Sequence, residues 1–523
     1  MFKNEPFTDF SVASNRSRFQ EVLDALDARV VTMSLVAGPI INGVELASDD
    51  RYERLDPSDA HELIGTTSFA SEKQTQDALN NLSQGFPAWR STSVTFRADM
   101  ARKVAARLRQ ERLHLAALMI REAGKPWKEA DADVAEAIDF CDYYAQELER
   151  ISTPLRTEEL VGEDNFYFYE ARGITAVISP WNFPLAIACG MVMAALVTGN
   201  VVALKPSEQT SLVAAEFARI LLECGVPGNA FAFLPGWGEK VGRMLVNSPL
   251  VAIIAFTGSK SVGLEIIKNA AIVHPSQSHI KRVIAELGGK NAIIIDQDAD
   301  LDEAVKGAAY SAFGFAGQKC SACSRVIVVG DAYEGFLQRF CDATSSLIVG
   351  AASDPATTIG PVIDRESADR IIAVIENSKK ISQLAFQGET PAKGFFAPPA
   401  IFHDVDVNSD LWREEVFGPV VACRKANSLD EAIKIATDSP YALTGGFFSR
   451  SPKNIAHVKE HFRVGNLYIN RGCTGALVCR QPFGGFKLSG IGSKAGGRDY
   501  LLQFLEPRTV TENTLRRGFA PEV

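Results

Sequence analysis

Short apolar runs alternate with amphipathic stretches through the middle of the chain. The runs at 174–178, 201–204 and 251–256 predict buried strands, and the stretches at 186–196 and 212–223 have the apolar spacing of helices. Repeated strand–helix units of this length predict a parallel, doubly wound sheet. Such sheets bind ligands beyond the carboxyl ends of their strands.

A second strand–helix block is predicted from about 292 to 462, with strands at 292–295 and 325–329. Ahead of the first block the spacing is helical, with one helix expected over 96–123, where Gly124 ends it, and another over 128–148. The chain is therefore expected to be an α/β protein with two doubly wound units.

The ends of the chain follow other patterns. Residues 9–27 predict a cap ending in a helix, and Ile40-Ile41-Asn42-Gly43 a strand and tight turn. An aromatic hairpin strand is expected at 165–170 and a polar edge strand at 501–514.

Residues 173–204 contain no charged side chain, which raises the possibility of a membrane span. Pro180, Pro184, Gly190 and Gly199 interrupt the stretch, so its unbroken apolar part is shorter than the ~20 residues that a span needs. Two buried strands and a helix explain it better. The first ten residues carry Lys3, Glu5 and Asp9 and match neither a secretory signal nor an Arg-rich transit peptide.

Composition and charge exclude several classes of binding partner. The 523 residues carry a formal net charge of -9 without a long basic run, which disfavours nucleic acid and anionic membranes. Nine cysteines, mostly scattered singly, do not form a disulfide framework and indicate a reducing, cytoplasmic setting. Cys320 and Cys323 have metal-site spacing but lack a second pair, so no metal is expected.

Cys320 is the first candidate for chemistry. It lies in Gly-Gln-Lys-Cys-Ser-Ala-Cys-Ser-Arg, 317–325, directly after Lys319. A neighbouring cation favours the thiolate, which is the nucleophile, so we expect Lys319 to lower the pKa of Cys320. A lone cysteine is more often a small buried hydrophobe, and other residues must support the assignment.

Glu286 and Asn182 are candidates of the same kind. Glu286 ends an apolar strand at 283–285 and precedes two glycines, where a carboxylate can act as general base or simply lie at the surface. Asn182 lies in Pro-Trp-Asn-Phe-Pro within the charge-free stretch. Its amide could donate to an oxyanion or cap a turn.

Two further fragments follow strands and suit a dinucleotide. Gly258 and Ser259 open a helix, where backbone N–H groups and a hydroxyl can bind a pyrophosphate, although a plain Ser cap gives the same pattern. Lys205 and Glu208 could contact two ribose hydroxyls, or form an ordinary turn. A carboxylate there repels a ribose phosphate and favours NAD over NADP.

These fragments occur in one order, and Glu415-Val416-Phe417-Gly418-Pro419 and Pro482-Phe483-Gly484-Gly485 follow them. In this combination the chain resembles the aldehyde dehydrogenase superfamily over nearly its whole length. The resemblance implies a family-like fold with an NAD-binding domain at 1–151 and 171–287. It further implies a catalytic domain at 288–490 and a small β oligomerisation element at 152–170 and 491–523.

Within the superfamily the chain is most similar to the Δ1-pyrroline-5-carboxylate (glutamate γ-semialdehyde) dehydrogenases. The matches are 3–10, 317–325, 470–476, 492–497 and Arg516-Arg517-Gly518-Phe519. One departure is Cys479, where such enzymes are expected to carry glycine. That change affects the expected shape of the substrate loop.

The resemblance also implies roles. Cys320 would form a thiohemiacetal and then a thioester, Asn182 and the Cys320 N–H would bind the oxyanion, and Glu286 would activate water. The implied NAD contacts are Lys205, Glu208, Gly258, Ser259, Glu415, Phe417, Ser179 and Trp181. The implied substrate contacts are Ser321 and the backbone N–H groups of Gly475 and Ala476, which would anchor the α-carboxylate. Phe183 and Phe483 would clamp the methylenes between them.

The expected reaction is NAD-dependent oxidation of L-glutamate γ-semialdehyde to L-glutamate, the second step of proline catabolism. Alternatives are another semialdehyde substrate, transfer of the acyl group to coenzyme A or phosphate, and a catalytically silent NAD-binding protein. Expected partners are a second copy, as a homodimer or an assembly of dimers, and a separate proline dehydrogenase that could supply substrate.

Overall fold

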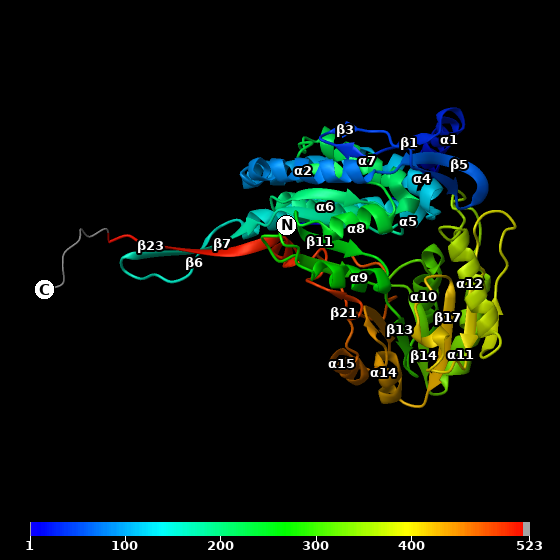
Figure 1. The fold of residues 1–523 in the computed structure, drawn as a ribbon. Coiled ribbons are helices and arrows are strands. Elements are labelled where there is room, and N and C mark those ends of the chain that lie inside the picture. Colours follow the sequence, from blue (N-terminus) through cyan, green and yellow to red (C-terminus); the bar gives the residue numbers. More distant parts are fainter. Residues whose placement is uncertain (1, 516–523) are drawn as a thin grey trace.

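The computed structural model describes residues 2–515, and Figure 1 shows two sheet-centred units with an arm projecting from the first. Within these residues the first unit holds an eight-stranded sheet and the second a seven-stranded sheet. Each unit has its own apolar core. The Arg516–Phe519 similarity lies outside the described residues.

The first sheet has the strand order β22-β12-β11-β8-β9-β10-β2-β3. Its central strands, from β12 to β10, pair in parallel as predicted, whereas β22, β2 and β3 pair antiparallel at the edges. The strands are β2 (Ile40–Ile41), β3 (Val44–Glu45), β8 (Ile174–Ile178), β9 (Val201–Lys205), β10 (Phe231–Phe233), β11 (Val251–Thr257), β12 (Arg282–Glu286) and β22 (Gly490–Ile491).

Helices cover this sheet (Figure 1), and the longest of them, α5, packs against α3, α4 and α6. The helices of this unit are α1 (Ala13–Met33), α2 (Glu72–Arg90), α3 (Val94–Gln110), α4 (Arg112–Ala123), α5 (Trp127–Ile151), α6 (Ala186–Val197), α7 (Ser211–Glu223), α8 (Arg243–Asn247) and α9 (Lys260–Ala270). The single helix expected over 96–123 is wrong, because the chain leaves helical geometry at Glu111 and forms α3 and α4.

The charge-free stretch is explained by burial inside the first unit. Helix α6 is apolar on all sides and lies between other elements, as a helix without a polar face must. It packs on α5, α3 and the neighbouring strands β8 and β9. Among residues 2–515 we find no helix with the length and apolarity that a bilayer crossing requires.

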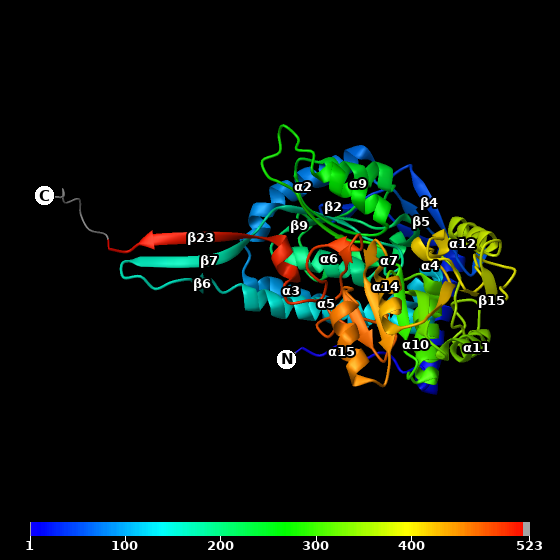
Figure 2. The same ribbon diagram turned by 90° about the horizontal axis from the view of Figure 1, so that it is seen from below.

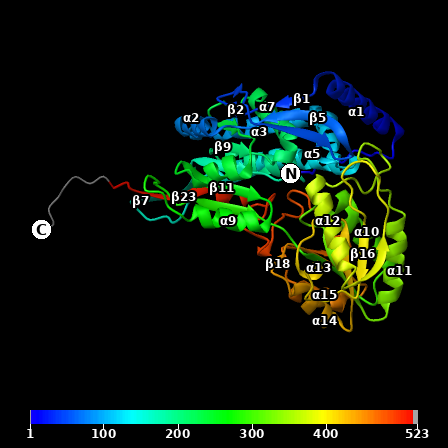
Figure 3. The ribbon, with the colours of Figure 1, turned by 45° about the vertical axis from the view of Figure 1, so that its right-hand side comes forward.

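The second sheet has the order β15-β16-β17-β14-β13-β19-β20, parallel except for the β15–β16 pair. Figure 3 shows it with α10, α11 and α12 beside the strands. Its strands are β13 (Asn291–Ile295), β14 (Cys323–Val329), β15 (Gln383–Gln387), β16 (Ala400–His403), β17 (Val420–Ala426), β19 (Thr444–Phe448) and β20 (Asn466–Ile469). Its helices are α10 (Leu301–Phe313), α11 (Ala332–Ser345), α12 (Arg365–Ser378), α13 (Asp410–Arg413), α14 (Leu429–Thr437) and α15 (Pro452–His461).

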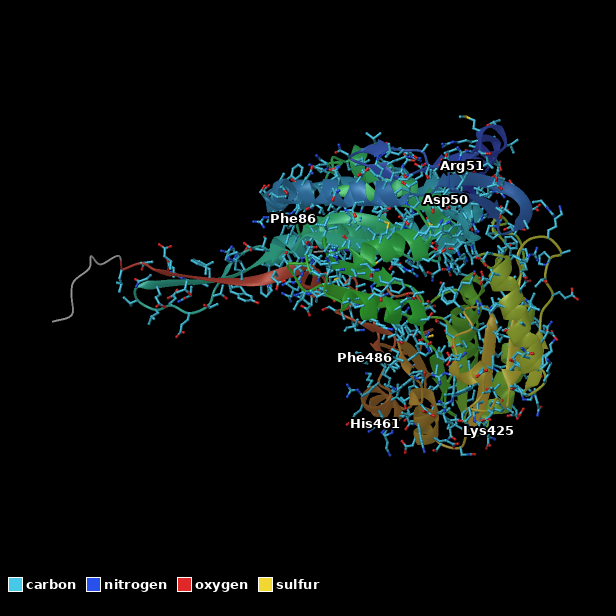
Figure 4. The ribbon with its side chains drawn as sticks, viewed as in Figure 1. Asp50, Arg51, Phe86, Lys425, His461 and Phe486 are labelled. Atoms are coloured by element: carbon cyan, nitrogen blue, oxygen red, sulfur yellow. The ribbon has the colours of Figure 1, made fainter. Side chains whose placement is uncertain are left out.

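The two sheets present opposite strand ends to their junction. In the first sheet the carboxyl ends carry the candidate residues, as the doubly wound pattern predicts. In the second sheet they lie at or before the amino ends, since Cys320 and Ser321 directly precede β14. Lys425, near the carboxyl end of β17, lies at the far side of the second unit in Figure 4, whereas Phe486 lies between the units.

The arm is a three-stranded antiparallel sheet of the order β23-β7-β6, and Figure 2 shows it extending away from both units. Its strands are β6 (Leu155–Arg156), β7 (Glu163–Ala171) and β23 (Leu505–Asn513). The register of β23 on β7 runs from Leu505 opposite Ala171 to Asn513 opposite Glu163. The predicted aromatic strand and polar tail strand are therefore partners, and the tail strand lies at an edge.

Two small sheets were not predicted. One joins β1 (Leu35–Ala37), β4 (Arg51–Asp56) and β5 (Asp59–Ser68), and the other joins β18 (Tyr441–Ala442) and β21 (Phe486–Lys487). Strand β5 reads Asp-Ala-His-Glu-Leu-Ile-Gly-Thr-Thr-Ser, without clean apolar alternation and with Gly65 inside it. A pattern of this kind does not signal a strand.

Candidate active site

Four neighbouring strands of the first sheet end in one row. Thr257 of β11 pairs with Glu286 of β12, Phe256 pairs with Ile178 of β8, and Ile178 pairs with Lys205 of β9. Because the strands are parallel, Glu286 and Lys205 lie on the same carboxyl edge. The sequence reasoning placed both residues there.

The second sheet contributes the loop that carries Cys320. The side chain of Asn291, the first residue of β13, donates to the carbonyls of Cys320 at 2.7 Å and Ala322 at 2.9 Å. Its Oδ1 accepts the Thr444 N–H at 2.9 Å, which ties the loop to β19. Sequence reasoning missed Asn291 as the residue that holds the thiol loop.

The approach to Cys320 is strained and tightly packed. Phe315 and Ala316 have φ values of 52° and 53°, in the left-handed region, and Gly317 follows at 69°. A Cβ on Gly317 would lie 2.3 Å from the Gly418 carbonyl oxygen. Glycine is required here because of that close approach.

A cavity of about 610 Å³ brings the predicted substrate residues together with two of the three predicted catalytic residues, whereas Asn182 is not among the residues that line it. Cys320 and Glu286 line it together with the predicted substrate residues, which are Phe183, Ser321, Gly475, Ala476 and Phe483. The lining combines strand ends of the first sheet, residues of α5, the loop before β14 and the loop after β20. The site is thus built at the junction of the two units.

The carboxyl of Glu286 has little to compensate for its removal from solvent. Among residues 2–515 its Oε1 has no hydrogen-bond partner. Burial raises the pKa of Glu286 to about 7, against a smaller lowering by Lys494. A carboxyl in this state can take up and release a proton near neutral pH.

The environment of Cys320 corrects one expectation. Burial first, and then the negative charges of Glu286 and Glu415, raise the pKa of the Cys320 thiol above its usual range. Lys319 attracts the thiolate, but its Nζ is also paired with Glu129 Oε1 at 2.7 Å and lies 5.3 Å from the centre of the Tyr310 ring. Its charge does not outweigh burial and the two carboxylates, so the prediction of a lowered Cys320 pKa is wrong.

Asn182 is buried next to the thiol loop. Its Nδ2 donates to the carbonyl of Gln318 at 3.0 Å, and its own carbonyl accepts Lys125 Nζ at 2.7 Å. Lys125 also pairs with Asp133 at 2.8 Å, inside the protein. This amide has two hydrogens, so one stays available beyond the bond to Gln318.

The predicted adenosine contacts form a polar group at the same sheet edge. Lys205 Nζ donates to Glu208 Oε1 at 2.7 Å, and the Gly238 N–H donates to the same oxygen at 2.8 Å. Ser259 caps α9, and Gly258 precedes it. The Oγ of Ser179, which follows β8, is buried and lacks a partner among the described residues. Hydroxyl, amine and carboxylate at one edge suit a ribose and its phosphate.

The other predicted NAD contacts come from both units, with Trp181 after β8 and with Glu415 and Phe417 before β17. Glu415 Oε1 accepts the Gly289 N–H at 3.0 Å. Burial raises the pKa of Glu415 to about 6, partly offset by that bond. The rings of Trp181 and Phe417 meet edge to face, 5.5 Å between centroids. A dinucleotide that spans this edge would meet residues of both units, so the residues fit NAD.

We call residues 470–479 the substrate loop, and its backbone is held by neighbouring side chains. Arg471 donates to the carbonyls of Thr474 at 3.1 Å and Gly475 at 3.3 Å, and the Cys473 N–H donates to Ser311 Oγ at 3.1 Å. Gly475 has a φ of 73°. Cys479 also has a positive φ, 67°, which explains in backbone terms why glycine is expected there.

Helix α5 supplies acidic residues that the sequence reasoning missed. Glu129 pairs with Lys319, Asp133 pairs with Lys125, and Glu136 lines the cavity. Burial first, and then nearby Asp133, raise the pKa of Glu136 to about 8. The signal was available, because positions 129, 133 and 136 share one face of the predicted helix.

Comparison with known proteins gives close matches over the whole chain. A family model described as the aldehyde dehydrogenase family matches residues 44–510. The 1-pyrroline-5-carboxylate dehydrogenase of Geobacillus sp. (strain WCH70) is 46% identical over 512 residues, which cover 98% of this chain and 99% of that protein.

Two solved structures are similar throughout. Thermus 1-pyrroline-5-carboxylate dehydrogenase with bound NAD has a TM-score of 0.96 and 40% identity, over 98% of this chain and 99% of that one. Proline utilization A (PutA) from Bdellovibrio bacteriovorus has a TM-score of 0.97 and 49% identity. It matches 100% of this chain, which spans 54% of the PutA chain.

Proposed function

The chain belongs to the aldehyde dehydrogenase family, and we propose that Cys320, Glu286 and Asn182 carry out its reaction in the cavity between the two sheets. The activity is the NAD-dependent oxidation of L-glutamate γ-semialdehyde, formed from Δ1-pyrroline-5-carboxylate, to L-glutamate. The observation that carries the assignment of roles is that one cavity is lined by a half-buried thiol and by a carboxyl whose pKa burial raises to about 7.

In the first step the sulfur of Cys320 attacks the aldehyde carbon. The raised pKa of the thiol means that a base has to remove its proton, and Glu286 is a carboxyl lining the same cavity. The oxyanion accepts hydrogen bonds from the free hydrogen of Asn182 Nδ2 and from the Cys320 N–H. Each such donor contributes about 3 kcal/mol to the transition state.

Bound NAD supplies the acceptor for the hydride that leaves the thiohemiacetal carbon. Cys320 then carries a thioester. Glu286 releases the first proton to solvent, takes a second proton from the water that attacks the thioester, and passes that proton to the departing sulfur. The C–S bond breaks, the sulfur is released as the thiol, and the product is a carboxylate. Lys205, Glu208, Gly258, Ser259, Ser179, Trp181, Glu415 and Phe417 are the residues that we propose hold NAD.

The substrate's α-carboxylate is assigned to Ser321 and to the backbone N–H groups of Gly475 and Ala476, and its methylenes to Phe183 and Phe483. All five residues line the cavity. Successive N–H groups in a glycine turn form an anion site. Among residues 2–515 no group of His, Cys, Asp and Glu suitable for a metal ion is present, and the scheme uses none.

Domain roles and assembly follow from the same arrangement. We propose residues 1–151 and 171–287 as the NAD-binding domain, 288–490 as the catalytic domain, and 152–170 with 491–523 as the oligomerisation element. The projecting arm supports a homodimer or an assembly of dimers, since β6 and β23 are its edges. A separate proline dehydrogenase in the cytoplasm is the proposed source of substrate, supported by similarity to roughly half of PutA.

Transfer of the acyl group to coenzyme A is the second candidate. Glu286 disfavours it, because a thiol acceptor does not need a base that activates water. Product analysis with and without coenzyme A distinguishes the two: glutamate formed at the same rate in both supports hydrolysis, and an acyl-coenzyme A product contradicts it.

Steady-state kinetics test the substrate assignment. With NAD, we expect kcat/KM for glutamate semialdehyde to exceed that for pentanal, an aldehyde of equal chain length, by about a hundredfold or more, because the anchor's N–H groups are left unpaired by pentanal. NADP in place of NAD is expected to lower kcat/KM, since Glu208 repels the ribose phosphate. Equal kcat/KM for the two aldehydes would contradict the assignment.

A further inference from the structure

The first residues of the chain lie across the substrate cavity rather than apart from the site. We call residues 4–10 the N-terminal strap, and its path alongside α5 can be followed in Figure 2. Phe7, Thr8, Asp9 and Phe10 all line the cavity that also contains Cys320. This segment is therefore part of the cavity wall.

Two aspartates of α5 hold the strap. Asp131 accepts the Thr8 N–H at 2.8 Å and the Thr8 hydroxyl at 2.6 Å, and Arg112 pairs with the same carboxylate at 2.7 Å. Asp139, two turns further along the helix, accepts the Glu5 N–H at 2.7 Å. Charged acceptors make these bonds stronger than neutral ones.

The strap is also fixed by its aromatic end. The Phe10 ring is buried, 5.5 Å from the centre of Phe19 on α1 and 5.4 Å from that of Trp127 on α5. Packing at one end and hydrogen bonds at the other leave the strap few alternative positions. It is thus a rigid support against which another segment can be placed.

Asn4 uses this support to hold the substrate loop. Its Nδ2 donates one hydrogen to Asp139 Oδ2 at 2.8 Å and the other to the carbonyl of Val478 at 2.9 Å. Val478 is buried and lies three residues after Gly475. One amide therefore connects α5 with the loop whose N–H groups are assigned to the α-carboxylate.

We propose that Asn4 is a positioning residue that sets the enzyme's preference for an aldehyde carrying an α-carboxylate, an inference that rests on the proposed function. An anion site made of backbone N–H groups works only if the backbone is held to within about 0.5 Å. Asn4 fixes that backbone from outside the loop. It touches neither the reacting carbon nor Cys320, so the chemistry of a simple aldehyde does not depend on it.

The test compares wild type with Asn4→Ala on two aldehydes. We expect KM for glutamate semialdehyde to rise about tenfold, as loss of a hydrogen-bonded anchor of this kind implies, while kcat/KM for pentanal changes less than about twofold. Hydrogen exchange of the 473–482 backbone should become faster in the variant, a readout that does not depend on activity. Asn4→Gln, which keeps the amide, should recover part of the preference.

Two matched variants control the comparison. Asn408→Ala removes an exposed asparagine whose Nδ2 donates to Asp406 in the second unit, and it should change neither KM nor hydrogen exchange of the loop. Thr8→Val removes the hydroxyl bond to Asp131 but has no contact with Val478, so its effect on KM should be smaller than that of Asn4→Ala.

The outcomes separate the two claims. If wild type prefers glutamate semialdehyde and Asn4→Ala keeps the full preference, or loses activity equally on both aldehydes, the role of Asn4 is wrong and the proposed function stands. If wild type shows no preference, both are wrong. If the preference falls while the pentanal reaction and the unfolding midpoint are kept, the role of Asn4 is supported.

Discussion

The two ends of the cavity are built in opposite ways. At the reaction end, the described residues leave Glu286 Oε1 without a hydrogen bond, and burial raises the pKa values of Glu286 and Cys320. At the anchor end, the substrate loop is tied by Arg471, Ser311 and Asn4. Groups that must change charge have few hydrogen-bond partners, whereas groups that must keep their position are held by hydrogen bonds.

The difference shows how one cavity can combine reactivity with selectivity. A buried carboxyl without its hydrogen bonds destabilises the folded protein, whereas a loop held by hydrogen bonds stabilises it. Changes at the reaction end should therefore act on kcat and leave stability intact or improved. Changes at the anchor end should act on KM and on stability.

Cys320→Ala tests the reaction end most directly. We expect kcat/KM for NADH formation to fall by roughly 10⁴-fold or more, because no other group can form the acyl bond. The unfolding midpoint should stay close to that of wild type, since the change to alanine removes only one half-buried sulfur atom. Cys323→Ala is the matched control, because Cys323 lies three residues away and its buried thiol donates to the Arg325 carbonyl at 3.3 Å.

The control should keep activity within about threefold, as expected for a small cavity away from the reacting atoms. Equal activity of wild type and Cys320→Ala would remove the thiol from the mechanism. Equal losses in both variants would show that the region is sensitive to packing rather than to the nucleophile.

Glu286→Gln is expected to have the next largest effect, a fall in steady-state kcat of about 10² to 10⁴-fold. The wild-type rate should rise with pH through about 7, because only the ionised carboxyl accepts a proton and burial raises its pKa to about 7. Glutamine cannot ionise, so the variant should lose that rise. The free energy of unfolding of Glu286→Gln should not fall along with its rate, since the neutral amide removes the cost of a buried charge.

Rapid mixing checks the same step. If Glu286 mainly serves the attacking water, the variant should produce NADH in an initial burst of up to one equivalent per site, followed by slow turnover. Absence of a burst, together with an unchanged pH profile in steady state, would place the slow step elsewhere and contradict this role.

The sequence predicts the reaction end better than the anchor end. Glu286, Cys320 and Asn182 lie in short motifs next to apolar strands, so that strand ends and spacing locate them. Lys319 does not lower the net pKa of Cys320, because burial and two nearby carboxylates outweigh its charge. Its amine is held by Glu129, a residue of α5 that is 190 positions away in the chain.

The anchor end depends on contacts between distant segments. Asn4 meets Val478 across 474 positions, and nothing in either local pattern indicates that contact. Asn291 is similar, since an asparagine at the start of a strand does not show which carbonyls it will bind. Strands β4 and β5 were not predicted from the sequence for a different reason. Their polar composition is as typical of a loop as of a strand.

Cys479→Gly tests the anchor end with the smallest expected effect. Cys479 has a φ of 67°, where a residue with a Cβ is strained by about 1 kcal/mol or more and glycine is not. Glycine gains flexibility when unfolded, which offsets part of this, so we expect the free energy of unfolding to rise by roughly 0.5 to 1 kcal/mol. Cys479→Ala is the matched control, since it removes the same exposed thiol but keeps the Cβ and the strain.

Denaturant midpoints of the three proteins at one protein concentration measure the difference. Equal midpoints for the Gly and Ala variants would mean that the backbone at 479 relaxes without cost, and that the substrate loop is held only by its side-chain bonds.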